Sequence, residues 1–156
     1  MVNMTKAEVM RLIDSSHETF DAKVNSLSPE QMAKPIGDSE WTPKDVVAHV
    51  TWSQREMLSV LRHRAMIGSD LWNLSQDERN AAVFAEYRAR PLDEVSQDAR
   101  EVFAQLRSEI ERLSEEQLND PAYIKDIPGG ITPWQLLSGS TWRHYEEHTN
   151  MLSELA

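Results

Sequence analysis

The sequence predicts an all-α protein, a four-helix bundle with a long helical crossover between its second and third helices. Three observations lead to this prediction. Apolar residues recur at helical spacing over several long segments, and residues that favour helices are abundant. Only five glycines occur in 156 residues, and they lie outside the strongest periodic segments. Cap residues followed by proline mark the points where helices should begin.

The first two helices of the bundle are expected over residues 5–27 and 42–61. Each begins with threonine as its N-cap, and the second has Pro43 at its first helical position. The apolar face of the second helix includes His49, so this imidazole should lie at or beside the core. A short helical turn capped by Ser28 precedes the second helix.

The long connection and the third helix follow. Residues 68–90 have a weaker pattern, in which Ser75 can cap a helix that crosses the bundle. The third helix should begin at Pro91 and has the cleanest apolar stripe of the chain. The residues of this stripe are Leu92, Val95, Ala99, Val102, Leu106 and Leu113.

Two halves of the chain resemble each other. Residues 27–32 are echoed by residues 113–118, and residues 42–52 are echoed by residues 132–142. This repeat predicts pseudo-twofold character, with the second and fourth helices in equivalent places. Chance similarity between common cap sequences is the alternative explanation.

The last helix, expected to run without interruption from Thr132 to Leu155, carries two histidines on its apolar stripe. His144 and His148 are four residues apart, so their side chains project from one face. This is the spacing by which a helix supplies two ligands to one metal ion. The alternative is that each histidine is a hydrogen-bonded core residue.

A third imidazole would complete a metal site. If the second and fourth helices are neighbours, His49 could meet His144 and His148, leaving one coordination position open as in catalytic zinc sites. The chain has no cysteine, so any metal would be held by histidine and carboxylate. Zinc and nickel lead the candidates for this divalent ion, but iron, manganese and cobalt also suit these ligands.

Aromatic and small residues surround these histidines. We expect them to shape a substrate pocket, with core packing as the alternative for the aromatic rings. The expected pocket residues are Trp52, Thr141, Trp142 and Tyr145. No residue is assigned a catalytic role beyond metal ligation.

Composition limits the remaining classes. Residues 1–156 are expected to form a single domain, and the chain has neither a signal peptide nor a long apolar run, which predicts a cytoplasmic protein. The formal net charge of −10 argues against nucleic acid and membrane surfaces as partners. A small-molecule substrate is therefore the expected partner.

The chain resembles a known superfamily. The segments that carry the resemblance are residues 41–49, Trp52 and residues 144–148, and they are similar to the DinB/YfiT-like superfamily of four-helix bundles. Asn80, residues 86–92 and residues 141–148 are similar in particular to its ClbS/DfsB branch. The motifs are short, but their order and spacing extend the resemblance over nearly the whole chain.

The resemblance implies a metal-binding triad at His49, His144 and His148. It also implies activity with low-molecular-weight thiols such as bacillithiol or mycothiol in S-transfer or isomerisation, or hydrolysis of a reactive cyclopropane as in the ClbS branch. We therefore expect a metal-dependent hydrolase or thiol S-transferase. The alternative is a non-catalytic protein that binds or sequesters a reactive small molecule. Members of the superfamily often dimerise through helix faces, so a homodimer is an implied assembly.

Overall fold

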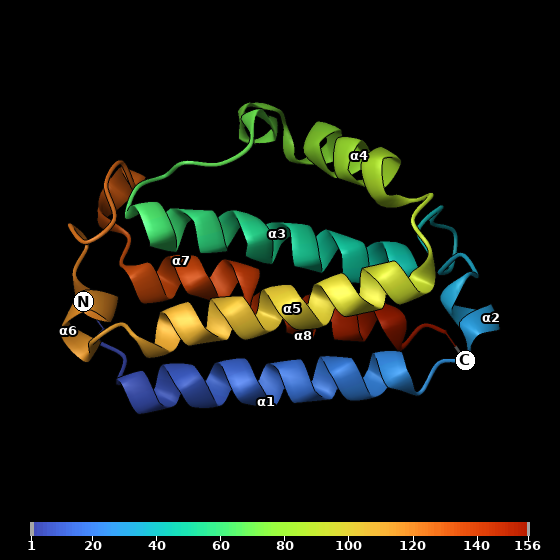
Figure 1. Ribbon diagram of the computed structural model, residues 1–156, viewed down its shortest axis with the longest axis horizontal. Coiled ribbons are helices and arrows are strands. Elements are labelled where there is room, and N and C mark those ends of the chain that lie inside the picture. Colours follow the sequence, from blue (N-terminus) through green and yellow to red (C-terminus); the bar gives the residue numbers. More distant parts are fainter. Residues whose placement is uncertain (1, 156) are drawn as a thin grey trace.

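A computed structural model describes residues 2–155 and has the expected all-α, four-helix architecture (Figure 1). The long axis of the molecule follows four helical segments that lie side by side, the last of them interrupted once. These segments are α1 (Lys6–Asn25), α3 (Pro43–His63), α5 (Leu92–Glu111) and the pair α7 (Pro133–Ser140) and α8 (Trp142–Leu152). The most extensive packing joins α3 to α5 and α1 to α8.

Capping boxes define where the helices of both halves begin. Before each of four helices, the backbone N–H of the cap residue donates to the side chain three positions ahead, at 2.9 Å in every case. The pairs are Ser28 with Gln31, Thr42 with Asp45, Ser114 with Gln117, and Thr132 with Gln135. Such caps satisfy N–H groups that a helix leaves unpaired, and each stabilises its helix by about 1 kcal/mol. Two of them begin the short helices α2 (Pro29–Met32) and α6 (Glu115–Asn119), which occupy equivalent places in the two halves.

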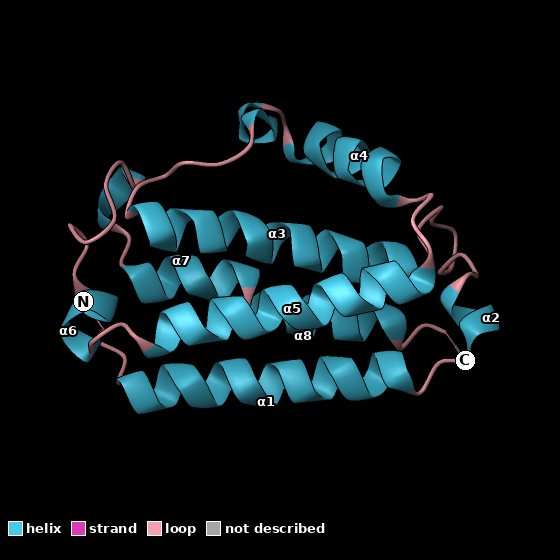
Figure 2. Cartoon of the chain, viewed as in Figure 1, coloured by secondary structure: helices cyan, strands magenta, loops and turns pink. Residues whose placement is uncertain are grey.

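The long connection after α3 is a helical crossover, as expected. It contains the 3₁₀ turn η1 (Asp70–Asn73) and α4 (Gln76–Tyr87), and Figure 1 shows α4 along the side of α3 away from α1. Val83 and Tyr87 anchor α4 to the bundle because both are buried. Apart from the 3₁₀ turn η2 (Pro128–Gly130), the remaining segments of residues 2–155 are loops and turns, with no strand (Figure 2).

The expected apolar stripes form the core. Most of the α5 stripe is buried, although Leu92 and Ala99 remain partly exposed. Burial of each large side chain contributes about 1.5–3 kcal/mol relative to exposure. Fully buried members of the core include Val9, Ile13, Val46, Leu106, Ile110, Leu137 and Leu152.

The expectation of one continuous last helix is wrong. Thr141 has φ −123° and ψ −108°, which lies outside the helical region and separates α7 from α8. The Thr141 hydroxyl donates to the carbonyl of Leu137 at 2.6 Å, and the carbonyl of Ser140 accepts from the Gln54 side chain of α3 at 3.3 Å. Hydroxyl side chains compete for backbone groups and Gly139 weakens helix propensity, so this segment tolerates a break.

No helix within residues 2–155 combines the length and apolar character needed to cross a membrane.

Candidate metal centre

His49 reaches the interior from the second turn of α3. Its neighbours Ala48 and Val50 are buried, so this part of α3 is surrounded by the core on more than one side. The Trp41 ring, from the loop before α3, lies edge-on to the imidazole with ring centroids 5.2 Å apart. His49 is therefore a half-buried residue at the edge of the core, as its place in the apolar pattern predicts.

The other two imidazoles come from α8, one helical turn apart. His144 and His148 have ring centroids 4.6 Å apart, and the His49 ring lies 4.9 Å from the first and 5.0 Å from the second. One ligand nitrogen can be chosen from each ring so that all three lie within 4.8 Å of one another. The expected convergence of these three histidines is confirmed. We refer to His49, His144 and His148 as the His cluster.

The spacing of two nitrogens suits a shared ion. The Nε2 atoms of His49 and His144 are 3.0 Å apart. Two imidazole nitrogens that bind one ion at about 2.1 Å lie about 3.0–3.4 Å apart for right-angled or tetrahedral coordination. The same distance also allows one neutral ring to donate a hydrogen bond to the other. The His49–His144 pair thus has the spacing of two ligands of one divalent cation, and a nitrogen of His148 lies within 4.8 Å of both.

Each ring of the cluster also has an unpaired nitrogen. The Nδ1 atoms of His49, His144 and His148 are buried and have no hydrogen-bond partner among residues 2–155. Leaving a buried polar atom unpaired costs about 1–3 kcal/mol, so three in one place require a reason other than stability. Three neutral imidazoles side by side offer one lone pair each, which is what a cation needs.

Burial keeps these imidazoles neutral. It lowers the pKa of His49 to about 3 and that of His144 to about 3, and the neighbouring rings add to both shifts. Burial also lowers the pKa of His148. A neutral imidazole has the free lone pair that a metal ion requires, so the cluster is in its metal-binding form at neutral pH.

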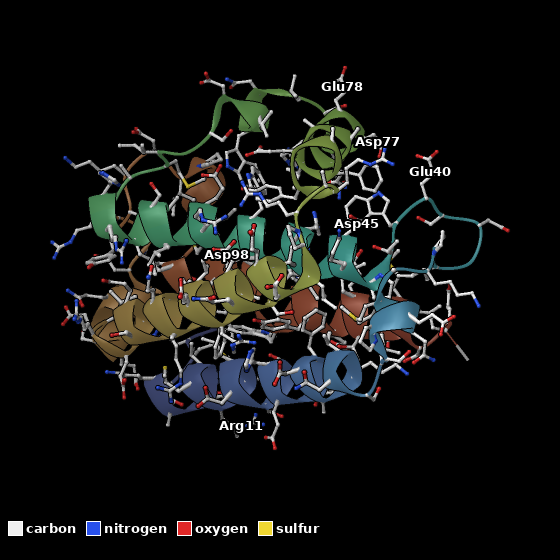
Figure 3. All side chains as sticks on the ribbon, turned by 45° about the vertical axis from the view of Figure 1, so that its right-hand side comes forward. Arg11, Glu40, Asp45, Asp77, Glu78 and Asp98 are labelled. Atoms are coloured by element: carbon white, nitrogen blue, oxygen red, sulfur yellow. The ribbon has the colours of Figure 1, made fainter. Side chains whose placement is uncertain are left out.

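The charged residues near the cluster come from α3, α4 and α8, where the carboxylate of Glu147 acts to raise the pKa of His148. Asp45, at the first turn of α3 (Figure 3), accepts hydrogen bonds from Thr42 as part of the helix cap. Glu56 accepts instead from the backbone N–H of Ser69. Arg79 of α4 contributes positive charge that helps to lower the pKa of His49. Its guanidinium lies 4.5 Å from the centre of the Trp72 ring.

Gln54 is a functional candidate that the sequence pattern did not reveal. Its side chain is 2% exposed, and its Nε2 donates to the Tyr145 hydroxyl at 2.6 Å as well as to the carbonyl of Ser140. It therefore ties α3 to both sides of the break before His144. The available signal was its spacing, since Gln54 follows Val50 by four residues on the buried face of α3.

The four expected pocket residues do not gather around one cavity. Trp52 is buried and packs on Trp72 with ring centroids 5.4 Å apart. Thr141 is fully buried at the helix break, and the Tyr145 hydroxyl faces Gln54. Trp142 lines a separate cavity of about 280 Å³ between α1 and α8.

A larger cavity lies elsewhere, beside α3 and α7. Its volume is about 480 Å³, within the usual range for small-molecule sites. Segment 66–70 forms its outer wall together with Trp72 and Asn73, and Ser53 and Ser140 lie on its helical side. No sequence pattern predicts this cavity, because its outer wall comes from an irregular connection without periodicity.

Comparison with known proteins identifies related folds. Residues 13–130 match the family described as the mycothiol maleylpyruvate isomerase N-terminal domain. No curated protein sequence matches the chain significantly. Among solved structures, the colibactin self-resistance protein ClbS in complex with double-stranded DNA matches with a TM-score of 0.82, 18% identity, and 99% and 97% coverage of the two chains.

Two further structures are similar. A protein from Streptococcus pneumoniae has a TM-score of 0.84 at 16% identity, covering 98% of this chain and 91% of its own. DfsB, described as a sibling lethal factor precursor, has a TM-score of 0.79 at 14% identity, covering 97% and 95%. Together with the family match, these likenesses support the expected place in the DinB/YfiT-like superfamily near ClbS and DfsB. At these identities the structural likenesses carry the fold alone.

One expectation about partners is corrected by this comparison. The net charge of −10 was taken to exclude nucleic acid, but ClbS, with the same fold, is found in complex with double-stranded DNA. A net charge sums over the whole surface and does not describe any one face of a protein. A net charge of −10 therefore does not exclude a nucleic-acid partner.

Proposed function

The chain belongs to the mycothiol maleylpyruvate isomerase N-terminal domain family, and from that premise we propose that it is a metal-dependent enzyme acting on a small electrophilic molecule. The His cluster would hold one divalent ion, with zinc and nickel as leading candidates. The ion would serve hydrolysis or transfer of a small thiol. The observation that carries the proposal is the convergence of three imidazoles whose ligand nitrogens lie within 4.8 Å of one another.

The chemistry of the donors supports this proposal. His49, His144 and His148 are uncharged at neutral pH because burial lowers their pKa values, so no proton must be displaced before a cation binds. A divalent cation bound there would lower the pKa of a water or thiol and polarise an electrophile.

Trp41 and Arg79 shape the surroundings of the His cluster. Burial by Trp41 and the helices limits access of bulk water to the imidazoles, which strengthens electrostatic interactions there. Arg79 adds positive charge on the α4 side of His49. That charge favours an anionic nucleophile such as a thiolate at the same place. The family description names mycothiol, which supports a low-molecular-weight thiol as co-substrate.

A second candidate function is non-catalytic binding of a reactive molecule. The cavity of about 480 Å³ and the likeness to ClbS, described as a self-resistance protein, support this alternative. In that case ligand-induced thermal stabilisation should persist after chelation. Because ClbS was solved with double-stranded DNA, a DNA duplex belongs in the same binding screen.

Metal analysis tests the first proposal. The wild type, His144→Ala and His63→Ala would be purified without a nickel column and assayed by elemental mass spectrometry. His63 is a matched control because it is exposed on α3 and does not belong to the His cluster. We expect about one ion per chain in the wild type and the control, and less than about one tenth of that in His144→Ala. Equal and negligible metal in all three proteins would overturn the proposal.

A further inference from the structure

The cavity beside α3 and α7 has an apolar interior and an apolar rim. Met57 and Val60 line it from α3, and Leu136 lines it from α7. Along its outer wall, Met66 is 45% exposed and Ile67 is 50% exposed. Large apolar side chains gathered at the edge of a cavity indicate a binding site more often than they serve stability.

The inner part of this cavity lies next to the His cluster along the chain. Ser53 lines the cavity and follows His49 by four residues, so both project from the same side of α3. Ser140 also lines it and comes directly before the break that leads into α8. A molecule in the cavity therefore sits one helical turn from a proposed metal ligand.

Glu56 is the fixed polar group of the cavity. Its two carboxylate oxygens accept from the backbone N–H of Ser69 at 3.0 and 3.2 Å. A carboxylate has about four acceptor positions, so further ones remain for a ligand. Gly68 allows this arrangement, because a Cβ there would lie 2.6 Å from Glu56 Oε2 and 3.2 Å from Trp72 Nε1.

The charged residues that line the cavity are all acidic. Glu56 and Asp70 are acidic, and none of the described residues that line the cavity is lysine, arginine or histidine. A ligand carboxylate would lose its hydration and gain no positive partner here, whereas an ammonium or an N–H group would find an acceptor.

We propose that this cavity binds the substrate, and that the substrate is a largely apolar molecule that presents an ammonium or N–H donor to Glu56 and no carboxylate to this surface. That the bound molecule is a substrate rests on the proposed enzymatic function, whereas the preference for an amine over a carboxylate rests only on the residues that line the cavity. An affinity difference of about tenfold is expected from one charge-assisted hydrogen bond.

Two probes with the same apolar body and opposite charges test this preference. Binding of 2-(1-naphthyl)ethylamine and of 1-naphthylacetate would be measured by titration calorimetry with metal-free and zinc-loaded wild-type protein. We expect the amine to bind at least tenfold more tightly than the carboxylate in both forms. Failure of both probes to bind at millimolar concentration, or equal or tighter binding of the carboxylate, would overturn the proposal.

Two variants test whether the preference for the amine arises from Glu56 and from this cavity. Glu56→Gln should remove the difference between the probes, whereas Glu18→Gln, an exposed position on α1, should keep it. Gly139→Leu should weaken both probes, because Gly139 lines the cavity and a Cβ there meets no atom within 4 Å. Its melting temperature would show that it is folded. A preference that survives in Glu56→Gln would contradict the proposal even if Gly139→Leu proved unstable.

Metal content, measured separately, distinguishes this proposal from the proposed function. A metal-free wild type that still prefers the amine would keep the binding site and remove its enzymatic role. A wild type with one ion per chain and no preference between the probes would keep the metal site and overturn the cavity proposal.

Discussion

The two helices that carry the His cluster begin alike and continue differently. Thr42 before α3 and Thr132 before α7 are both followed by proline, and both N–H groups donate to the side chain three positions ahead. From there α3 runs unbroken for 21 residues, whereas its counterpart stops after eight. Both helices enter the bundle in the same way, and His144 and His148 face His49 from α8, the part of the counterpart that follows the interruption. The comparison leads to the hypothesis that the site depends on the break, where the two halves of the repeat differ.

The largest expected effect comes from removing the hydrogen bonds by which Gln54 of α3 joins both sides of the break between α7 and α8. Gln54→Leu should lower the free energy of unfolding by about 3 kcal/mol, because the Ser140 carbonyl and the Tyr145 hydroxyl both lose a buried partner. Urea unfolding measures the effect. Gln105→Leu, at an exposed position of α5, is the control and should change stability by less than about 0.5 kcal/mol.

A second test makes the fourth helix resemble α3 more closely. Replacing Gly139, Ser140 and Thr141 together by alanine raises helix propensity and removes the hydroxyl bond to Leu137, so the break should become less favourable. Zinc affinity should fall at least tenfold, since α8 would turn away from His49. Competition with a fluorescent chelator measures this affinity. Gln105→Ala with Ser108→Ala on α5 is the control, and unchanged affinity in the triple variant would remove the proposed role of the break.

A smaller effect tests whether the two halves are equivalent. Ser28 and Ser114 accept from the N–H three residues ahead at 3.1 Å in both cases, and both are exposed. Ser28→Ala and Ser114→Ala should each lower the free energy of unfolding by about 1 kcal/mol. Chemical denaturation of the two variants side by side gives the comparison, and a clear inequality would show that only one half relies on its cap.

The smallest expected effect concerns pH and a histidine outside the cluster. Burial against Phe103, at a ring distance of 3.5 Å, lowers the pKa of His17 from its ordinary value of 6.5. Below pH 6.5 the unfolded chain then binds more protons than the folded protein, so stability falls as the pH decreases. His17→Gln should reduce this loss between pH 7.5 and 5.5 in urea unfolding of the metal-free protein. Identical pH dependence in wild type and variant would assign the slope to other groups.

Much of the fold could be predicted because its signals are local. Cap residues, proline at the first helical turn and apolar stripes all act within a few residues, so helix starts and the crossover agree with the structure. Periodicity also placed His49, His144 and His148 on the inner faces of neighbouring helices, where residues at the same level along the bundle meet.

The rest depends on contacts between distant segments. The break at Thr141 requires Gln54 of α3 to satisfy a freed carbonyl, and no local pattern at either position records that bond. The large cavity depends on how segment 66–70 folds back over α3. The four expected pocket residues are close in sequence to the histidines, but closeness in sequence does not place side chains around one cavity: Trp52 packs on Trp72, and Trp142 lines a different cavity.

The distance along the chain between the imidazoles sets an order of events. His49 and His144 are 95 residues apart, so their side chains meet only after the first and last parts of the chain have assembled. An ion held by all three rings would recognise the finished bundle and not the unfolded chain. Metal loading would then report the completion of folding, and it would stabilise the finished protein by mass action.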